Sequence, residues 1–191
     1  MSLKAMWRTG RFRVAMGVAN TLGLRRWARC LAQQSLVSNP DDPFVLATLA
    51  HEQSLEGAWS QARETLLRCT ALRPHDGGTW FNLGYVCQRL ERLQEAERCF
   101  RTATQESPEL DRAWYGLGLV LIAQDRLSEA VEALKVNTRL QPMSPYGWYQ
   151  LARVQADLGA RDEAVATIDR LRQFEPKVAR QVERETGLCA P

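Results

Sequence analysis

The sequence predicts an all-α protein, a solenoid in which antiparallel helix pairs stack along one axis. Five prolines recur at a constant interval of 34 residues, namely Pro40, Pro74, Pro108, Pro142 and Pro176. The segments between these prolines repeat one pattern of large and small residues, without the alternation that is typical of strands. Such a period indicates helical repeats, each of which buries its apolar face only against its neighbours.

The first half of each repeat is predicted to be a helix. We number each repeat so that its closing proline is position 32. Position 4 is then large and apolar, position 7 is leucine and position 8 is small, which is the spacing of one helical face. In chain order these residues are Leu46, Leu49 and Ala50; Trp80, Leu83 and Gly84; Trp114, Leu117 and Gly118; and Trp148, Leu151 and Ala152.

The second half is predicted to be a helix that packs closely on the first. Position 20 is always alanine and position 24 is large: Ala62 and Leu66, Ala96 and Phe100, Ala130 and Leu134, Ala164 and Ile168. Small residues at positions 8 and 20 let the two helices approach, and large residues at positions 4 and 24 fill the space around them. Proline ends the second helix, because it has no amide hydrogen and disfavours helical geometry before it. Glycine-containing turns at 55–57 and 157–159 are expected to join the helices.

This numbering divides the chain into four full repeats with a cap at each end. The repeats span 43–76, 77–110, 111–144 and 145–178. Residues 1–42 are expected to hold a degenerate repeat, in which Met16 replaces the small residue of position 8. The residues that fit its other positions are Phe12, Ala15, Ala19 and Ala28. Residues 177–191 are predicted to form a C-terminal capping helix and tail, with Val178, Val182 and Leu188 on one face.

The N-terminal segment is strongly basic. Residues 1–40 contain seven basic residues and no acidic one, namely Lys4, Arg8, Arg11, Arg13, Arg25, Arg26 and Arg29. The rest of the chain has 18 basic and 22 acidic residues, so the net charge of +3 is the sum of a basic N-terminal segment and an acidic remainder. Such a segment could contact an acidic partner or an anionic membrane surface, or be a solvated face of the capping helix. Nucleic-acid binding has no motif to support it. A signal peptide fits poorly, because the apolar run at 14–24 is short and is followed by Arg25 and Arg26 instead of a small-residue cleavage site. The acid-free, Arg-rich start resembles an organelle transit peptide, but it can be fitted to the repeat frame.

The cysteines do not indicate a metal or redox site. The five cysteines are Cys30, Cys69, Cys87, Cys99 and Cys189, and none forms a C-x-x-C pair. Positions 27 and 11, which hold Cys69 and Cys87, are expected in the core, where a free cysteine behaves as a small hydrophobe. We therefore expect no cofactor and no metal. Unpaired cysteines also favour a reducing, cytoplasmic location, with peripheral membrane association through the basic segment as an option.

Catalytic residues are not evident in the sequence. The only two histidines are His51, expected on an exposed helical face, and His75, expected in a turn between repeats. Neither has an evident relay partner. The glycines in GLGLVL at 116–121 lack the Lys-Ser/Thr of a phosphate-binding loop. The sequence therefore predicts a protein that is not an enzyme.

The repeat pattern resembles a known family. The segment WFNLGYVCQRLERLQEAERCFRTATQESP matches the Trp, Leu-Gly, Tyr, Ala, Phe, Ala and Pro pattern of tetratricopeptide repeats, and the resemblance covers about residues 43–176. It implies a right-handed superhelix in which positions 2, 5, 6, 9, 12 and 13 of the first helices line a concave groove. The groove residues implied in this way are Phe44, Phe81, Asn82, Tyr85, Arg89, Arg112, Tyr115, Leu119, Ile122, Tyr149 and Arg153.

An aromatic groove with arginines predicts a non-enzymatic adaptor or assembly scaffold. Such residues anchor protein interfaces, so we expect a partner's peptide or helix in the groove, with apolar side chains among the rings and acidic flanks at the arginines. Each ring could instead pack between repeats. The family's carboxylate clamp for chaperone tails is largely absent, because Ala47, His51 and Gly116 stand where Lys, Asn and Arg are needed. The alternative is a secretion-type or assembly chaperone that shields a hydrophobic client segment.

Overall fold

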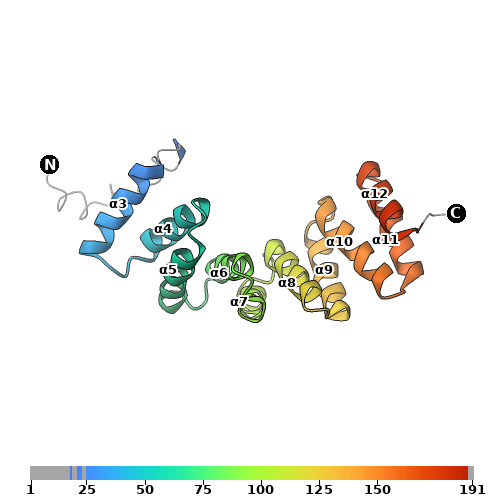
Figure 1. Ribbon diagram of the computed structural model, residues 1–191, viewed down its shortest axis with the longest axis horizontal. Coiled ribbons are helices and arrows are strands. Elements are labelled where there is room, and N and C mark those ends of the chain that lie inside the picture. Colours follow the sequence, from blue (N-terminus) through green and yellow to red (C-terminus); the bar gives the residue numbers. More distant parts are fainter. Residues whose placement is uncertain (1–17, 19–20, 23–24, 189–191) are drawn as a thin grey trace.

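A computed structural model describes residues 18, 21–22 and 25–188 of the chain, which form ten helices and no strand (Figure 1). The helices are α3 (Arg25–Ser38), α4 (Pro43–Leu55), α5 (Trp59–Leu72), α6 (Gly77–Arg89), α7 (Leu93–Glu106), α8 (Asp111–Ala123), α9 (Leu127–Leu140), α10 (Pro145–Asp157), α11 (Arg161–Arg172) and α12 (Pro176–Thr186). The predicted all-α repeat solenoid is confirmed.

The helices stack as pairs along an open arc. Each first helix packs on its own second helix, and each second helix packs on the first helix of the following pair. Figure 1 shows that the two ends of the arc, α3 and α12, rise on the same side. Helices α4 and α6 lie on the inner side of this arc, and α5 and α7 lie on the outer side. The arrangement therefore leaves one face of the first helices open.

Small residues set how closely the helices approach. The alanines of position 20 are fully buried in all four repeats. A Cβ atom built on Gly84 would lie 2.8 Å from the Phe100 ring, and one on Gly116 would lie 2.7 Å from the same ring. Because real Cβ atoms do not approach so closely, the Phe100 ring occupies the space that both glycines leave. Gly118 leaves the equivalent space for Leu134, at 2.8 Å.

The turn inside each pair has the same backbone conformation. Gly57 and Gly159 have φ of +75° and +74°, and Glu91 and Asp125, at the same position of the middle repeats, have φ of +59°. The left-handed region is open to glycine but disfavoured for other residues. The middle repeats therefore adopt the glycine conformation with a non-glycine residue, because packing of the hairpin fixes the turn.

In the last three repeats a tryptophan at position 4 links the repeat to the proline before it. The indole N–H of Trp80 donates to the carbonyl oxygen of Pro74 at 2.7 Å. The same bond joins Trp114 to Pro108 at 2.8 Å and Trp148 to Pro142 at 3.0 Å. These half-buried rings thus pack on the core and satisfy a carbonyl at the end of the preceding helix. This hydrogen bond is the physical reason for the constant spacing between proline and tryptophan.

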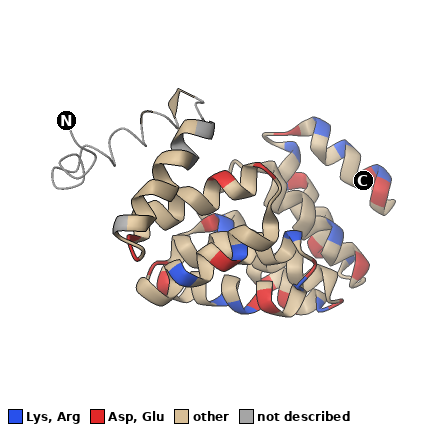
Figure 2. Cartoon of the chain, turned by 60° about the vertical axis from the view of Figure 1, so that its left-hand side comes forward, with Lys and Arg blue, Asp and Glu red and all other residues tan. Residues whose placement is uncertain are grey.

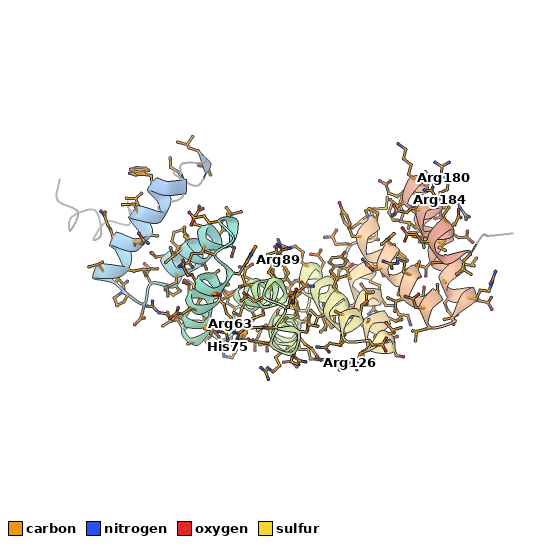
Figure 3. The ribbon with its side chains drawn as sticks, viewed as in Figure 1. Arg63, His75, Arg89, Arg126, Arg180 and Arg184 are labelled. Atoms are coloured by element: carbon orange, nitrogen blue, oxygen red, sulfur yellow. The ribbon has the colours of Figure 1, made fainter. Side chains whose placement is uncertain are left out.

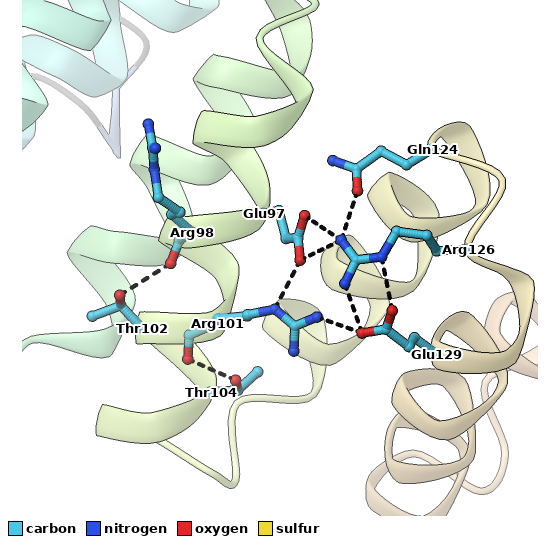
Figure 4. Close-up of polar contacts among 8 residues, drawn as sticks. All are labelled: Glu97, Arg98, Arg101, Thr102, Thr104, Gln124, Arg126 and Glu129. Carbon is cyan, nitrogen blue, oxygen red and sulfur yellow. Dashed lines mark hydrogen bonds and ion pairs between the residues drawn. The ribbon is translucent and has the colours of Figure 1, made fainter.

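Ion pairs join neighbouring repeats through their second helices. Glu97 of α7 accepts hydrogen bonds from Arg101 at 2.9 Å and from Arg126 at 2.7 Å, while Arg101 and Arg126 also bind Glu129 (Figure 4). Burial alone would raise the pKa of Glu97, but the hydrogen bonds from both arginines hold it below its usual range. Figure 2 shows basic and acidic residues interspersed along the repeats, as such pairing requires.

The buried cysteines are core residues, as predicted. Cys69, Cys87 and Cys99 are buried and free, and Cys30 is exposed on α3. Burial raises the pKa of Cys69 to about 11, so its thiol stays protonated. Among the described residues, no group of His, Cys, Asp or Glu is placed to hold a metal ion. Cys189 lies outside the described residues.

The structure describes the C-terminal end of the stack more fully than the N-terminal end. Helix α12 packs on α10 and α11 and buries Ala179 and Val182. At the other end, Leu31 and Ala32 of α3 pack on α4. The predicted basic surface lies largely beyond the described residues, which exclude Lys4, Arg8, Arg11 and Arg13; Arg25, Arg26 and Arg29 lie on α3. The residues predicted for the degenerate first helix, Phe12, Ala15, Met16 and Ala19, also lie outside them.

Candidate binding groove

The predicted groove residues differ in exposure. Six of them are exposed: Phe44, Asn82, Tyr85, Arg89, Arg112 and Arg153. Five are half-buried: Phe81, Tyr115, Leu119, Ile122 and Tyr149. Of the half-buried set, Phe81, Tyr115 and Ile122 pack against the central core, and Tyr149 packs against the C-terminal core. The alternative that rings pack between repeats therefore applies in part, and the remaining surface of these rings faces the groove.

A pocket of about 280 Å³ lies between α4 and α6. Its walls include Ala47 and Ala50 of α4, Trp59 of α5, and Phe81 and Tyr85 of α6. The space exists because position 5 is alanine in the first repeat, whereas it is Phe81, Tyr115 or Tyr149 in the others. Because Ala47 has no ring, a hollow remains beside the rings of Phe81 and Tyr85.

Trp59 is a groove residue that the sequence reasoning missed. It begins α5, a second helix, but its ring meets Tyr85 edge-on at a centroid distance of 6.1 Å. The guanidinium of Arg89 stands 5.1 Å above the Trp59 ring, which is a cation–π contact. The signal in the sequence was that position 17 is aromatic in the first repeat alone, where the others have Leu93, Leu127 and Arg161.

The middle of the groove repeats this combination of a ring and an arginine. Arg112, at the start of α8, stands 5.1 Å above the ring of Phe81 in the preceding repeat. A second hollow, of about 390 Å³, lies where α8 and α10 meet and is lined by Arg112, Tyr115 and Tyr146, among others. Burial raises the pKa of Tyr115, so its hydroxyl is a neutral hydrogen-bonding group at physiological pH. Ring and guanidinium thus alternate along the open face.

The C-terminal end of the groove is occupied by the chain itself. The hydroxyl of Tyr149 donates to Oε2 of Glu185 in α12 at 2.7 Å, and Nε of Arg153 lies 3.7 Å from the same oxygen. Arg153 also stands 5.5 Å above the Tyr149 ring. The expectation that Arg153 is free to select a partner's acidic residue therefore needs correction, because an internal carboxylate already lies there.

The arginines of the inner and outer faces have different partners. On the outer side, Arg63 binds Glu95 at 2.6 Å and Arg126 binds Glu97 and Glu129. Arg89 and Arg112 make no ion pair with any described residue, and their guanidinium groups lie on rings. Figure 3 shows Arg89 on the upper, inner side of the arc and Arg63 and Arg126 on the lower side. The groove therefore carries positive charge that the described protein does not neutralise.

The two histidines are exposed. His51 borders the pocket between α4 and α6, and His75 lies in the turn before α6, where its Nδ1 is 3.0 Å from a carboxylate oxygen of Glu106. The repeat pattern did not indicate this partner of His75. Gly116, where a carboxylate clamp would need arginine, is buried against Phe100. A long side chain has no room at this position.

Comparison with known proteins agrees with the repeat pattern and the helix arrangement. Residues 88–136 match a family described as tetratricopeptide repeat. This part of the chain is therefore similar to tetratricopeptide repeats. Comparison with curated protein sequences gave no match.

Solved tetratricopeptide-repeat structures share the fold at low sequence identity. YrrB, described as a TPR protein with an unusual peptide-binding site, has a TM-score of 0.81 and 15% identity, over 95% of this chain and 96% of its own. A MamA protein has a TM-score of 0.81 and 20% identity, over 96% and 97%. MamA from Desulfovibrio magneticus RS-1 has a TM-score of 0.79 and 18% identity, over 86% and 93%. At these identities the likeness establishes the fold.

The same fold class presents an extended surface for other proteins. Stacked helical repeats leave a curved concave face, and this face is the one that such proteins use for protein–protein contacts. None of the helices in the described part of the chain is long and apolar enough to cross a membrane.

Proposed function

We propose that this protein is a non-enzymatic adaptor or assembly scaffold, which binds an extended segment of a partner protein in its concave groove. The observation that carries the proposal is that Arg89 and Arg112 lie on aromatic rings along the open face, without a carboxylate partner among the described residues. A ring buries a large area on binding at little entropic cost, and an arginine adds a charge-assisted hydrogen bond. The partner segment is therefore apolar with acidic flanks.

The internal contact at Glu185 supports the acidic flank. The carboxylate of Glu185 accepts a hydrogen bond from Tyr149, and Arg153 lies above the ring of this tyrosine. The hydrogen bond from Tyr149 holds the pKa of Glu185 below its usual range. The pairs Trp59–Arg89 and Phe81–Arg112 offer a ring and an arginine in a similar way, without an internal acid among the described residues. YrrB, with its described peptide-binding site, is a precedent for peptide binding on this fold.

The proposal can be tested with peptides selected on the intact chain. A displayed library of random peptides is enriched on the wild-type protein, and a synthetic copy of the enriched peptide is titrated against variants. Arg112→Glu and Tyr115→Ala should each weaken binding, by roughly tenfold or more for a central contact. Arg98→Glu makes the same charge change at an exposed position of α7 and should have little effect.

Two results would count against the proposal. Equal affinity of the wild type, Arg112→Glu and Tyr115→Ala would exclude the groove as the binding surface. Enrichment of purely apolar peptides, whose affinity is unaffected by Arg112→Glu, would favour the alternative of a chaperone that shields a hydrophobic client. Acidic flanks should also make the affinity fall as salt is added, because salt screens exposed charges.

A further inference from the structure

The pocket between α4 and α6 is one of the hollows along the groove, and three aromatic rings contribute to its walls. The other three repeats have an aromatic residue at position 5, namely Phe81, Tyr115 and Tyr149, whereas the first repeat has Ala47. The volume of about 280 Å³ is just below the range of about 300–1,000 Å³ that is typical of pockets for drug-sized ligands. This size suits one bulky side chain better than a separate small molecule.

The walls of this pocket suit an aromatic or large aliphatic group. Leu66 and Val86 are buried residues that contribute to the lining, so part of it is core. The rings of Trp59, Phe81 and Tyr85 supply the aromatic walls, and Trp59 and Tyr85 already meet edge-to-face at 6.1 Å. A fourth ring can join such a cluster with favourable edge-to-face geometry and loses its hydration shell on entry.

The rim of the pocket supplies two polar groups of different kinds. Arg89 stands over Trp59 and makes no ion pair with a described residue, so its charge is available next to the opening. The side chain of Asn82 is exposed at the edge and makes no hydrogen bond with a described residue. An amide side chain can donate to and accept from a peptide group, whereas a guanidinium pairs with a carboxylate.

From these three features we infer that the pocket is an anchor site for one bulky apolar side chain of an extended partner segment. Asn82 holds the peptide group of that residue, and Arg89 pairs with an acidic residue beside it. The inference rests on the proposed function and deepens it, because it names the residue type that the partner must have and where it binds. The partner is a protein segment with an aromatic or large aliphatic residue next to Asp or Glu.

The decisive variant is Ala47→Tyr, which places in the first repeat the ring that the third and fourth repeats have at the same position. The fold already accommodates tyrosine there, so the variant should keep its thermal midpoint while the hole is filled. Ala166→Tyr is the matched control, because Ala166 is an exposed alanine on the second helix α11. Both variants are compared with the wild type by circular dichroism before binding is measured.

Selection from the displayed peptide library is repeated on the wild type and on Ala47→Tyr. On the wild type we expect peptides with a bulky apolar residue next to Asp or Glu, and on Ala47→Tyr we expect this pair to disappear. A synthetic copy of the wild-type peptide should bind Ala47→Tyr roughly thirtyfold more weakly, the loss typical of removing a hot-spot contact. It should bind Ala166→Tyr with unchanged affinity.

A double-mutant cycle assigns the two contacts. Replacing the bulky peptide residue by alanine should weaken binding to the wild type but have little further effect on Ala47→Tyr. Replacing the acidic peptide residue by its amide should likewise have little further effect on Arg89→Gln. Additive losses in both cycles would overturn the assignment of these contacts.

The outcomes separate this inference from the proposed function. If Ala47→Tyr binds the peptide as tightly as the wild type while Arg112→Glu and Tyr115→Ala do not, the groove binds the partner but the anchor site is wrong. If none of these variants changes the affinity, both proposals are wrong. Failure to enrich any peptide with an apolar residue next to an acidic one on the wild type also overturns the anchor site.

Discussion

The hydroxyl of Tyr149 donates a hydrogen bond of 2.7 Å to Glu185, so the C-terminal helix covers the last part of the concave face. Arg172 of α11 also binds Glu183, which fixes the same helix. The open part of the groove therefore runs from α4 to α8, where Arg89 and Arg112 have no carboxylate partner among the described residues. The open groove thus ends where Glu185 binds Tyr149, and Glu185 lies on α12, the helix that the sequence predicted as the C-terminal cap.

Replacing Glu185 by alanine should lower the pKa of Tyr149. The hydrogen bond to Glu185 is the main cause that raises this pKa, because a carboxylate acceptor favours the protonated hydroxyl. Nuclear magnetic resonance of the tyrosine Cζ carbon as a function of pH measures the titration directly. Gln181→Ala is the control, since Gln181 donates to the other oxygen of Glu185 and leaves the Tyr149 bond in place. An unchanged titration in Glu185→Ala would show that the two side chains do not meet in solution.

Replacing Gly116 by alanine should destabilise the protein by about 1–3 kcal/mol, the cost of overpacking a filled core. In an open helix the same change would stabilise, by about 0.5–1 kcal/mol. The new Cβ would lie 2.7 Å from the Phe100 ring. Urea denaturation measures the loss, and Phe100→Leu in the same chain should relieve part of it, because the ring is removed. A stabilising effect of Gly116→Ala alone would contradict the packing.

Replacing Glu52 by valine should stabilise the protein. Glu52 is only 2% exposed, at position 10, where the other repeats bury Val86, Val120 and Val154. Its Oε2 has no hydrogen-bond partner among the described residues. A buried polar group without a partner costs about 1–3 kcal/mol, which valine would avoid. The urea midpoint should rise in Glu52→Val and change less in Glu52→Gln, and a fall in Glu52→Val would mean that the carboxylate binds a group beyond these residues.

Replacing Glu97 by glutamine should cost about 1 kcal/mol of stability at neutral pH, since its half-exposed arginine partners are screened by solvent. The pKa of Glu97 is lowered in the folded state, so its contribution is present at neutral pH. It is lost progressively as the pH falls from the usual pKa of glutamate, about 4, through the lowered pKa of the folded state. The difference in stability between the wild type and Glu97→Gln should therefore shrink at about pH 3. Glu132→Gln, which breaks one exposed pair with Lys135, is the control and should change little. A difference that is independent of pH would contradict the ion pairs.

The repeat pattern predicted the contacts that form within one helical hairpin. Position 8 and position 24 face each other within a hairpin, so the small residue Gly84 and the large residue Phe100 indicated their own contact. The contacts that the sequence did not reveal join different repeats or a cap: Trp59 with Arg89, Arg112 with Phe81, and Glu185 with Tyr149. Such contacts depend on the curvature of the stack, which sequence periodicity does not specify. The basic residues before Arg25, which are Lys4, Arg8, Arg11 and Arg13, lie outside the described residues, and their role stays a prediction.

The most direct test of the central claim is the structure of the chain bound to a peptide selected on it. The groove interpretation predicts that the peptide lies along the inner faces of α4, α6 and α8, with an apolar side chain beside Trp59 and acidic residues at Arg89 and Arg112. A peptide bound instead to the outer face formed by α5, α7 and α9, with these arginines still in contact with solvent, would contradict it.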